Sequence, residues 1–206
     1  EADPEHIRTV ATDGHRLAMC TVATGGGDSR LQVIVPRKGV LELARLLSEG
    51  EEQVGVVIGS NHLRASIGGF TFITKLVDGK FPDYERVIPR GGEQEVVGDR
   101  LGLREAFQRT AILSNEKYRG VRITLDTGSL TVQANNPEHE EAEETVEVQY
   151  DGDALEIGFN VSYLMDVLGV LDTELVRITV SDANSSAVIE EPGGGDSVYV
   201  VMPMRL

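Results

Sequence analysis

The segment ATDGHRLA, residues 11–18, combines a predicted turn with side chains that could bind a peptide. Its tripeptide TDG is typical of a turn, because Asp bonds to its own backbone and Gly adopts positive φ. An imidazole, a guanidinium and an apolar side chain follow at once, on His15, Arg16 and Leu17. Such a group at a strand edge could hold a peptide by polar and apolar contacts together. A hairpin turn with a polar tip is the simpler interpretation, and both stay open here.

The acidic run EHEEAEE, residues 138–144, is the most conspicuous charged segment. A solvated loop is the plainest interpretation. A metal site is a weaker one, because His139 is the only nearby imidazole and no HExxH pattern or regular ligand spacing accompanies it. We therefore expect no metal and no cofactor.

Residues for covalent catalysis follow no recognisable pattern. The sequence contains no GxSxG motif, and the nearest Cys–His combination is Cys20 with His15, five positions apart. Carboxylates are so abundant that a catalytic pair, as in a nuclease or polymerase, stays an alternative. We expect a protein that is not an enzyme.

Composition limits the class of protein. The chain has 206 residues, enough for one or two domains, and 40% of them are hydrophobic. It has no apolar run long enough for a membrane span and no visible signal peptide, and its single cysteine fits a reducing cytoplasm. A net charge of −15 argues, by itself, against contact with nucleic acid.

Periodicity predicts helices and strands in alternation. Helix patterns begin at Pro36, at Leu103 and after Asn160, a plausible N-cap, and they end near Gly50, Leu113 and Leu171. The segment 81–93 has the composition of a linker. The predicted buried face of the first helix consists of Val40, Leu43, Ala44, Leu46 and Leu47. Strands are predicted over 53–58, 63–67, 70–76, 121–125, 130–134, 145–150, 155–159, 176–180, 187–190 and 198–202.

Two halves of the chain repeat each other at an offset of about 120 residues. TVATD at 9–13 resembles TVQAN at 131–135, and VIVPRKGVLELARLL at 33–47 resembles EIGFNVSYLMDVLGVL at 156–171. The second copy contains two helix patterns and the first contains one. We therefore expect a duplicated domain whose first copy lacks its opening strand and helix.

Several motifs, in order along the whole chain, resemble the bacterial DNA sliding clamps, the beta subunits of DNA polymerase III. Besides ATDGHRLA they are VIVPRKGV at 33–40, KLVDGKFPDYERVIP at 75–89, AILSNEKYRGVR at 111–122, ANNPEHEEAEE at 134–144, IGFNVSYLMDVL at 157–168 and YVVMPMRL at 199–206. The resemblance implies an α+β DNA-clamp fold of pseudo-symmetric repeated domains, each with two helices backed by antiparallel sheets. Residues 1–85 would be the C-terminal part of the middle domain, and residues 86–206 a complete last domain.

The resemblance also implies a pocket for short peptides with Leu and Phe anchors, in the last domain and at its junction with the middle one. The tail VVMPMRL would belong to this pocket, although a core strand with a frayed end is the simpler interpretation of it. The matching positions are Thr12, Gly14, His15, Arg16, Leu17, Pro82, Arg86, Val87, Tyr118, Asn160, Tyr163, Ser186, Val200, Val201, Met202, Pro203, Met204, Arg205 and Leu206. At Asn184, where an apolar residue can occur in clamps, one wall would be more polar.

Two further surfaces follow from the resemblance. An edge that pairs with the first domain of a partner protomer would contain Ile112, Leu113, Glu138, Glu140, Glu141, Glu143 and Glu144. A DNA-facing surface would contain Arg37, Lys38, Arg45, Arg104 and Arg109, although solvated helix faces explain these residues equally well.

The function implied is that of a cytoplasmic processivity factor. A homodimeric ring would encircle duplex DNA without sequence preference, so acidity elsewhere on the chain is no obstacle. Its pocket would tether the replicative polymerase, the clamp loader and repair polymerases. The alternative is a stand-alone peptide-binding adaptor that forms no ring.

Overall fold

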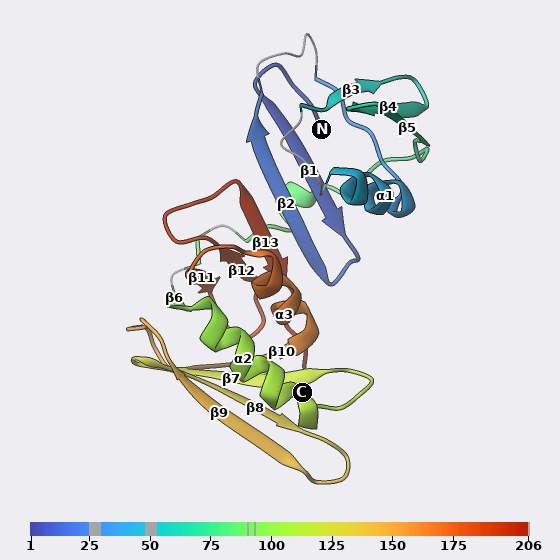
Figure 1. Cartoon of the computed structure of the whole chain (residues 1–206). Helices are drawn as coiled ribbons and strands as arrows, with labels where there is room; N and C mark the ends of the chain where they lie inside the picture. The colour runs from blue at the N-terminus through green and yellow to red at the C-terminus, as the bar shows by residue number, and fades with distance from the viewer. Residues whose placement is uncertain (25–29, 48–52, 90, 93, 206) are drawn as a thin grey trace. The chain divides into compact units, whose positions relative to one another are not determined.

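The computed structural model describes residues 1–24, 30–47, 53–89, 91–92 and 94–205, which fall into two compact units (Figure 1). Unit 1 contains Glu1–Ile7 and Thr24–Asp83, and unit 2 contains Arg8–Ala23 and Tyr84–Leu206. The chain therefore contributes an early hairpin to unit 2 before it forms most of unit 1. All the strand pairs with a described register are antiparallel, and the α+β class is confirmed.

Unit 2 contains a six-stranded sheet with the order β1-β2-β13-β12-β11-β6. Its strands are β1 (His6–Thr12), β2 (Arg16–Ala23), β6 (Gln94–Asp99), β11 (Leu175–Val180), β12 (Ala187–Glu190) and β13 (Ser197–Val201). The strand β2 pairs with β13, the last strand of the chain, from Arg16 opposite Val201 to Cys20 opposite Ser197. The early hairpin is therefore built into the sheet that the C-terminal residues complete.

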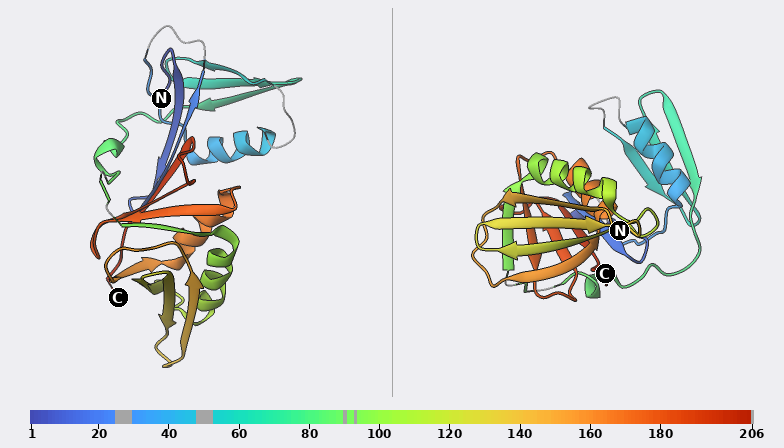
Figure 2. Two further views of the ribbon diagram at one scale, coloured as in Figure 1. Left: turned by 90° about the vertical axis from the view of Figure 1, so that its left-hand side faces the viewer. Right: turned by 90° about the horizontal axis from the view of Figure 1, so that it is seen from below.

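A second sheet of unit 2 has the order β10-β7-β8-β9. Its strands are β7 (Gly120–Asp126), β8 (Ser129–Asn135), β9 (Glu141–Glu147) and β10 (Leu155–Asn160). Helix α2 (Arg100–Thr110) packs against helix α3 (Val161–Val170) and against β8 and β9 (Figure 2). One core joins the helices and both sheets, and Leu103, Phe107, Leu130, Leu164 and Ile189 are among its fully buried side chains.

Both helices of unit 2 begin at a capping side chain. Asp99 caps α2 by accepting a hydrogen bond of 2.6 Å from the backbone N–H of Gly102. The helix therefore begins at Arg100, three residues before the predicted start at Leu103. Asn160 caps α3 as predicted. The predicted last turn of α2 is the separate 3₁₀ turn η2 (Ala111–Leu113), which leaves Ile112 76% exposed.

The acidic segment is a strand where the sequence favours a loop. Residues 141–144 form the first half of β9, and 145–150 is predicted as strand but contributes only Thr145–Glu147 to it. Exposed and half-buried residues alternate along β9, so most of its carboxylates point to solvent while the backbone pairs with β8. Every other predicted strand is present, with its ends within two residues of the prediction.

Unit 1 contains helix α1 (Arg37–Leu47) and a three-stranded sheet, β3 (Gly55–Ile58), β4 (His62–Ile67) and β5 (Phe70–Lys75). Gly39 is buried, and a Cβ there would lie 2.7 Å from Oγ1 of Thr74, so glycine allows α1 to approach β5. The predicted buried face of α1 is largely wrong. Val40, Ala44 and Leu47 are exposed and Leu43 and Leu46 only half-buried, because no second helix covers α1 within the described part of unit 1.

None of the described helices has the length and hydropathy that crossing a membrane requires. The single cysteine, Cys20, is a free thiol on β2 and is partly buried.

Candidate functional site

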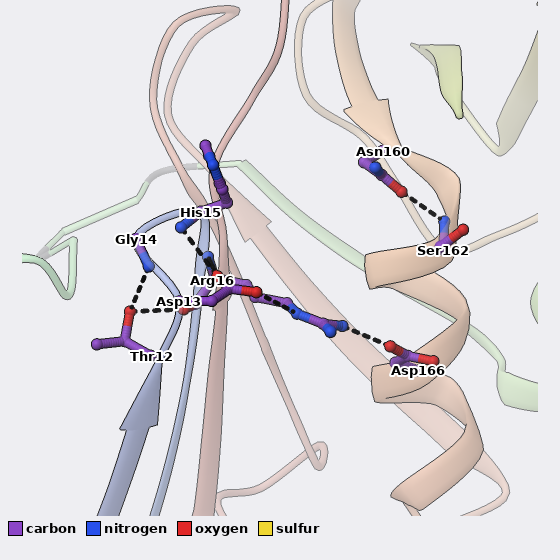
Figure 3. A network of polar contacts seen from close by, with 8 residues as sticks. All are labelled: Thr12, Asp13, Gly14, His15, Arg16, Asn160, Ser162 and Asp166. Atoms are coloured by element: carbon purple, nitrogen blue, oxygen red, sulfur yellow. Dashed lines mark hydrogen bonds and ion pairs between the residues drawn. The ribbon is translucent and has the colours of Figure 1, made fainter. Parts of the chain in front are cut away.

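The segment ATDGHRLA forms a tight turn between β1 and β2, as predicted (Figure 3). The hydroxyl of Thr12 accepts a hydrogen bond from the N–H of Gly14 (3.1 Å) and donates one to the carbonyl of Arg16 (2.8 Å). The carboxylate of Asp13 accepts hydrogen bonds of 3.0 Å from the N–H groups of His15 and Arg16. Gly14 has φ of 87°, which glycine adopts without strain. The turn thus fixes the direction in which its two basic side chains leave the backbone.

The side chain of Arg16 is held from three directions. Its Nε donates to Asp13 (3.1 Å), and its Nη1 donates to Asp166 on α3. The guanidinium carbon lies 4.4 Å from the ring centroid of Tyr163, a cation–π contact, and the ring of His15 stacks on the same tyrosine at 6.5 Å between centroids. Arg16 therefore joins the turn to helix α3 and lies as a flat layer on an aromatic ring.

Both partners of the ion pair between Asp13 and Arg16 stay charged near neutral pH. Burial acts to raise the pKa of Asp13, but two backbone N–H donors and the Arg16 guanidinium outweigh it, and the pKa lies below its usual value. Burial likewise acts to lower the pKa of Arg16, but Asp166 and Asp13 outweigh it, and the pKa lies above its usual value.

Apolar side chains lie beside this polar cluster. Leu17 is 4% exposed and sits opposite Val200, which is 1% exposed, in the pairing of β2 with β13. Ser186 directly precedes β12, whose first residue, Ala187, pairs with Val201. The predicted residues of β2, β12 and β13 therefore meet at one end of the six-stranded sheet.

The segment after β13 is held by its backbone. The N–H of Met202 donates to the carbonyl of His15, and the N–H of Met204 donates to the carbonyl of Gly158, both at 2.9 Å. Residues 202–204 are therefore tied to the turn and to β10, and the alternative of a frayed strand end is wrong for them. Leu206 lies outside the described residues.

The loop before β7 contributes a second group. Asn160 accepts a hydrogen bond from the N–H of Ser162 (2.9 Å), and its amide donates to the carbonyl of Tyr118 (3.2 Å). The Tyr118 ring is largely exposed, and Nζ of Lys117 lies 5.1 Å from its centroid. One side chain therefore caps α3 and holds this loop beside it.

Arg119 fixes the same loop in an unusual backbone conformation. Its φ is 52°, in the left-handed region, and its guanidinium donates to the carbonyl of Ala111 (2.9 Å) and to the hydroxyl of Ser162 (3.4 Å). Its own carbonyl accepts from the N–H of Val161 (2.8 Å). The loop is thereby joined to the start of η2 and to the start of α3.

Three predicted pocket residues do not enter this cluster in any described contact. Pro82 is an exposed residue of unit 1. Arg86 ends the short 3₁₀ turn η1 (Tyr84–Arg86) of unit 2, and Val87 follows it; both are exposed. Their membership of one site stays a prediction, as does that of Pro203, which lies within the held backbone, and of Arg205, which follows it.

Sequence reasoning missed three residues that build the site, namely Asp166, Arg119 and Gly158. No local signal marks Asp166, because its partner Arg16 lies 150 positions away in the sequence. Gly158 and Arg119 lie within quoted motifs, but their contacts are to residues that the residue types of those motifs do not indicate: the carbonyl of Gly158 to Met204, and the guanidinium of Arg119 to Ala111 and Ser162.

The predicted partner edge and the predicted DNA-facing surface meet at one ion pair. Arg109 donates to both carboxylate oxygens of Glu144, with 2.7 Å between Nη2 and Oε2, and it also contacts Glu105. The Arg109 guanidinium holds the pKa of Glu144 below its usual value. Strand β9, which carries this glutamate, is at the end of its sheet and pairs on one side only.

The other basic residues predicted to face DNA lie on helices. Arg37 and Lys38 begin α1 and are exposed, as is Arg104 on α2. Arg45 donates to Glu42 at 2.6 Å, three residues earlier on α1. Among the described residues, no three His, Cys, Asp or Glu side chains converge where they could hold a metal ion.

The comparisons with known proteins agree over the length of the chain. Residues 1–83 match the family described as the DNA polymerase III beta subunit, central domain, and residues 85–205 match its C-terminal domain. The curated beta sliding clamp of Pseudomonas aeruginosa is 67% identical over 97% of this chain, and that of Escherichia coli K12 is 52% identical over 100%. The chain spans only 55% and 56% of their lengths, respectively.

Solved structures show the same similarity in three dimensions. A crystal structure of the DNA polymerase sliding clamp from Pseudomonas aeruginosa with ligand has a TM-score of 0.96 at 66% identity, over 100% of this chain and 56% of that one. A second, of a sliding clamp from the same organism bound to griselimycin, also has a TM-score of 0.96, at 65% identity and with the same coverage of both chains. The fold predicted from the motifs is therefore confirmed.

Proposed function

The chain belongs to the family of the DNA polymerase III beta subunit, and from this premise we propose that it acts as the C-terminal part of a DNA sliding clamp. In the full-length protein, a homodimeric ring encircles duplex DNA in the bacterial cytoplasm and raises the processivity of the polymerase. The observation that supports this proposal most strongly is that both domains match the clamp family and that the sequence is up to 67% identical to a curated clamp. The chain itself catalyses no step in this function.

Residues 1–85 then belong to the middle clamp domain and residues 86–206 form the last one. The two family matches, which meet at residues 83 and 85, support this division. The hairpin β1–β2 belongs to the middle domain by sequence and to unit 2 by its contacts. It thereby brings middle-domain residues to the site of the last domain.

We propose that the cluster around His15, Arg16 and Tyr163 is the peptide-binding site. The support is that polar groups from β2 and α3 lie beside the apolar pair Leu17–Val200, next to a tail fixed by two backbone hydrogen bonds. Leu and Phe anchors of a partner peptide would bury apolar area here, and the polar groups would orient its backbone. The replicative polymerase, the clamp loader and repair polymerases are the partners that this site serves.

The partner edge is proposed along β9 and η2. Its support is an unpaired strand edge lined with carboxylates, beside Ile112, which is 76% exposed. Glutamates at such an edge set register and partner choice through ion pairs with a basic surface. Because Glu144 engages Arg109 and Glu42 engages Arg45, we propose that Arg37, Lys38 and Arg104 carry more of the contact with DNA phosphates than Arg109 and Arg45 do.

The test of the peptide site is a fluorescence anisotropy titration with a labelled peptide of the Gln-x-x-Leu-Phe type. The double variant His15→Ala, Arg16→Ala removes the proposed site. The matched control is His62→Ala, Arg64→Ala, which removes the same residue types from exposed positions of β4 in unit 1.

The site is supported if the unaltered chain binds the peptide saturably, the variant His15→Ala, Arg16→Ala binds it at least tenfold more weakly, and the control variant keeps an affinity within twofold of the unaltered chain. Equal affinities for all three proteins, with circular dichroism confirming that each is folded, would refute it.

Ring function is tested on the full-length protein: a clamp loaded on circular DNA is released when the circle is cut. Retention on cut DNA would contradict a topological mechanism. No observation favours the stand-alone adaptor, which would bind peptide yet form no ring.

A further inference from the structure

We propose that Asp166 determines ligand specificity at the peptide site by holding Arg16 as part of the wall, so that a ligand carboxylate cannot bind this arginine. The inference rests on the proposed function, because it concerns which peptides that site selects. Nothing in the sequence points to Asp166, whose role follows from its contact with a residue 150 positions away.

The donors of Arg16 are directed at protein carboxylates. One edge of the guanidinium faces Asp13 through Nε, and Nη1 faces Asp166 (Figure 3). The guanidinium carbon also lies 4.4 Å from the ring centroid of Tyr163. An arginine that is to bind a ligand carboxylate bidentately needs two parallel donors free. Of the five N–H donors, one on Nε and one on Nη1 are committed, in different directions, to two different carboxylates, so each edge that could bind a carboxylate bidentately includes a nitrogen that is already engaged.

The charge balance of the cluster works in the same direction. Asp13 and Asp166 together outweigh the single positive charge of Arg16, so the group has a net charge of −1 near neutral pH. A carboxylate next to this group would meet like charge and would have to displace an existing partner. A neutral side chain would meet only the flat face of an arginine and a tyrosine.

The two aspartates differ in what else they do. Asp13 also accepts two backbone hydrogen bonds within the turn, so its replacement would disturb the backbone. Asp166 lies on α3 with 64% of its side chain exposed, and its described contact is with Arg16. Asp166→Asn is therefore a change in charge at a surface position, and it releases Arg16 with little effect on the fold.

The experiment compares three labelled peptides by anisotropy on four proteins and on a control variant, Asp172→Asn. The neutral peptide is Gln-Leu-Ser-Leu-Phe with an amidated C-terminus. The acidic peptides are the same sequence with a free C-terminal carboxylate and the same sequence with an added C-terminal Glu amide. The C-terminal end is chosen because the Leu and Phe anchors would contact Leu17, the neighbour of Arg16. The proteins are the unaltered chain, Asp166→Asn, Arg16→Ala and the double variant Arg16→Ala, Asp166→Asn.

The expected result is a selective gain. Asp166→Asn should bind at least one acidic peptide about threefold to fivefold more tightly than the unaltered chain does, the size of one exposed ion pair, and the neutral peptide within twofold. The gain should vanish in the Arg16→Ala background, because the released guanidinium causes it. Asp172→Asn, which removes the same charge just beyond the end of α3, should leave all three affinities unchanged.

Other outcomes would overturn the inference. If Asp166 has a merely structural role, Asp166→Asn would change the affinities for the neutral and acidic peptides alike. If the gain is a general electrostatic effect of removing one negative charge, it would persist in the Arg16→Ala background or appear equally in Asp172→Asn. No change for either acidic peptide in Asp166→Asn would also refute it. Failure of the unaltered chain to bind the neutral peptide would instead refute the proposed peptide site itself, and this inference with it.

Discussion

Replacing Asn160 by Ala removes two hydrogen bonds that connect three parts of unit 2. The side chain caps α3 at the N–H of Ser162 and donates to the carbonyl of Tyr118. Loss of an N-cap costs about 1 kcal/mol, and loss of the second bond costs a further 0.5–1.5 kcal/mol, or about 1. We therefore expect the free energy of unfolding to fall by about 2 kcal/mol and Tm by about 8 °C, at about 4 °C per kcal/mol for a unit of this size.

The same substitution should weaken peptide binding, because the loop that carries Tyr118 is then held by fewer bonds. A loss of about 1 kcal/mol corresponds to about fivefold in Kd. Asp99→Ala is the matched comparison, since Asp99 caps α2 in the same way and is not among the proposed site residues. It should lower the free energy of unfolding by about 1 kcal/mol and leave Kd within twofold.

Stability would be measured by urea unfolding followed by far-ultraviolet circular dichroism, and binding by peptide anisotropy at 20 °C, where all proteins are folded. Two results would refute the reasoning. If Asn160→Ala unfolds at the same urea concentration as the unaltered chain, the hydrogen bonds carry no net stability. If Asp99→Ala weakens binding as much as Asn160→Ala does, the loss of affinity reflects general destabilisation and not the Tyr118 loop.

Three further outcomes follow from single contacts. Arg119→Ala should be about 1 kcal/mol less stable than Arg119→Gly, because both lose the guanidinium but only Ala is strained at φ of 52°; thermal unfolding decides, and equal Tm values would contradict it. Glu144 has a depressed pKa, so its ion pair with Arg109 contributes stability above the usual pKa of 4.5, and this contribution is lost as pH falls through the lower folded value. Urea midpoints between pH 6 and pH 3 should therefore decline less steeply in Arg109→Gln than in the unaltered chain, and parallel curves would count against the pair. Leu17→Ala, at 4% exposure, should cost 2–5 kcal/mol in urea unfolding, about the range for buried leucines, and a loss below 1 kcal/mol would show that Val200 repacks over the cavity.

The sequence predicts best the local structures that depend on contacts between residues close together in the chain. Asn160 is a correct N-cap because the cap depends on a side chain and a backbone N–H two residues away. The turn at Asp13 follows from the same kind of local hydrogen bond. The family motifs extend this reach, because they lead to the fold that the comparisons confirm.

Contacts between distant segments explain what the sequence misses. Residues 141–144 look like a solvated loop because glutamate disfavours strands, yet pairing with β8 overrides that preference at a sheet edge where the charges stay in water. Periodicity correctly identifies the apolar stripe of α1, but it cannot say whether another element covers that stripe, and Val40 and Leu47 stay exposed. Asp166 escapes for the same reason: its partner comes from the opposite end of the chain.

The pairing of β2 with β13 has a consequence for how the protein reaches its native state. Cys20 lies opposite Ser197, so β2 pairs with a strand that is synthesised long after it. The edge of β2 must stay unpaired until the residues up to β13 are made, and closing so large a loop slows folding more than it weakens the final pairing. Until then β2 is an open strand edge, the kind of surface on which nascent chains join one another. Its apolar segment from Leu17 to Val22 is thus open to association with other nascent chains until β13 is made, although much of it is covered once folding is complete.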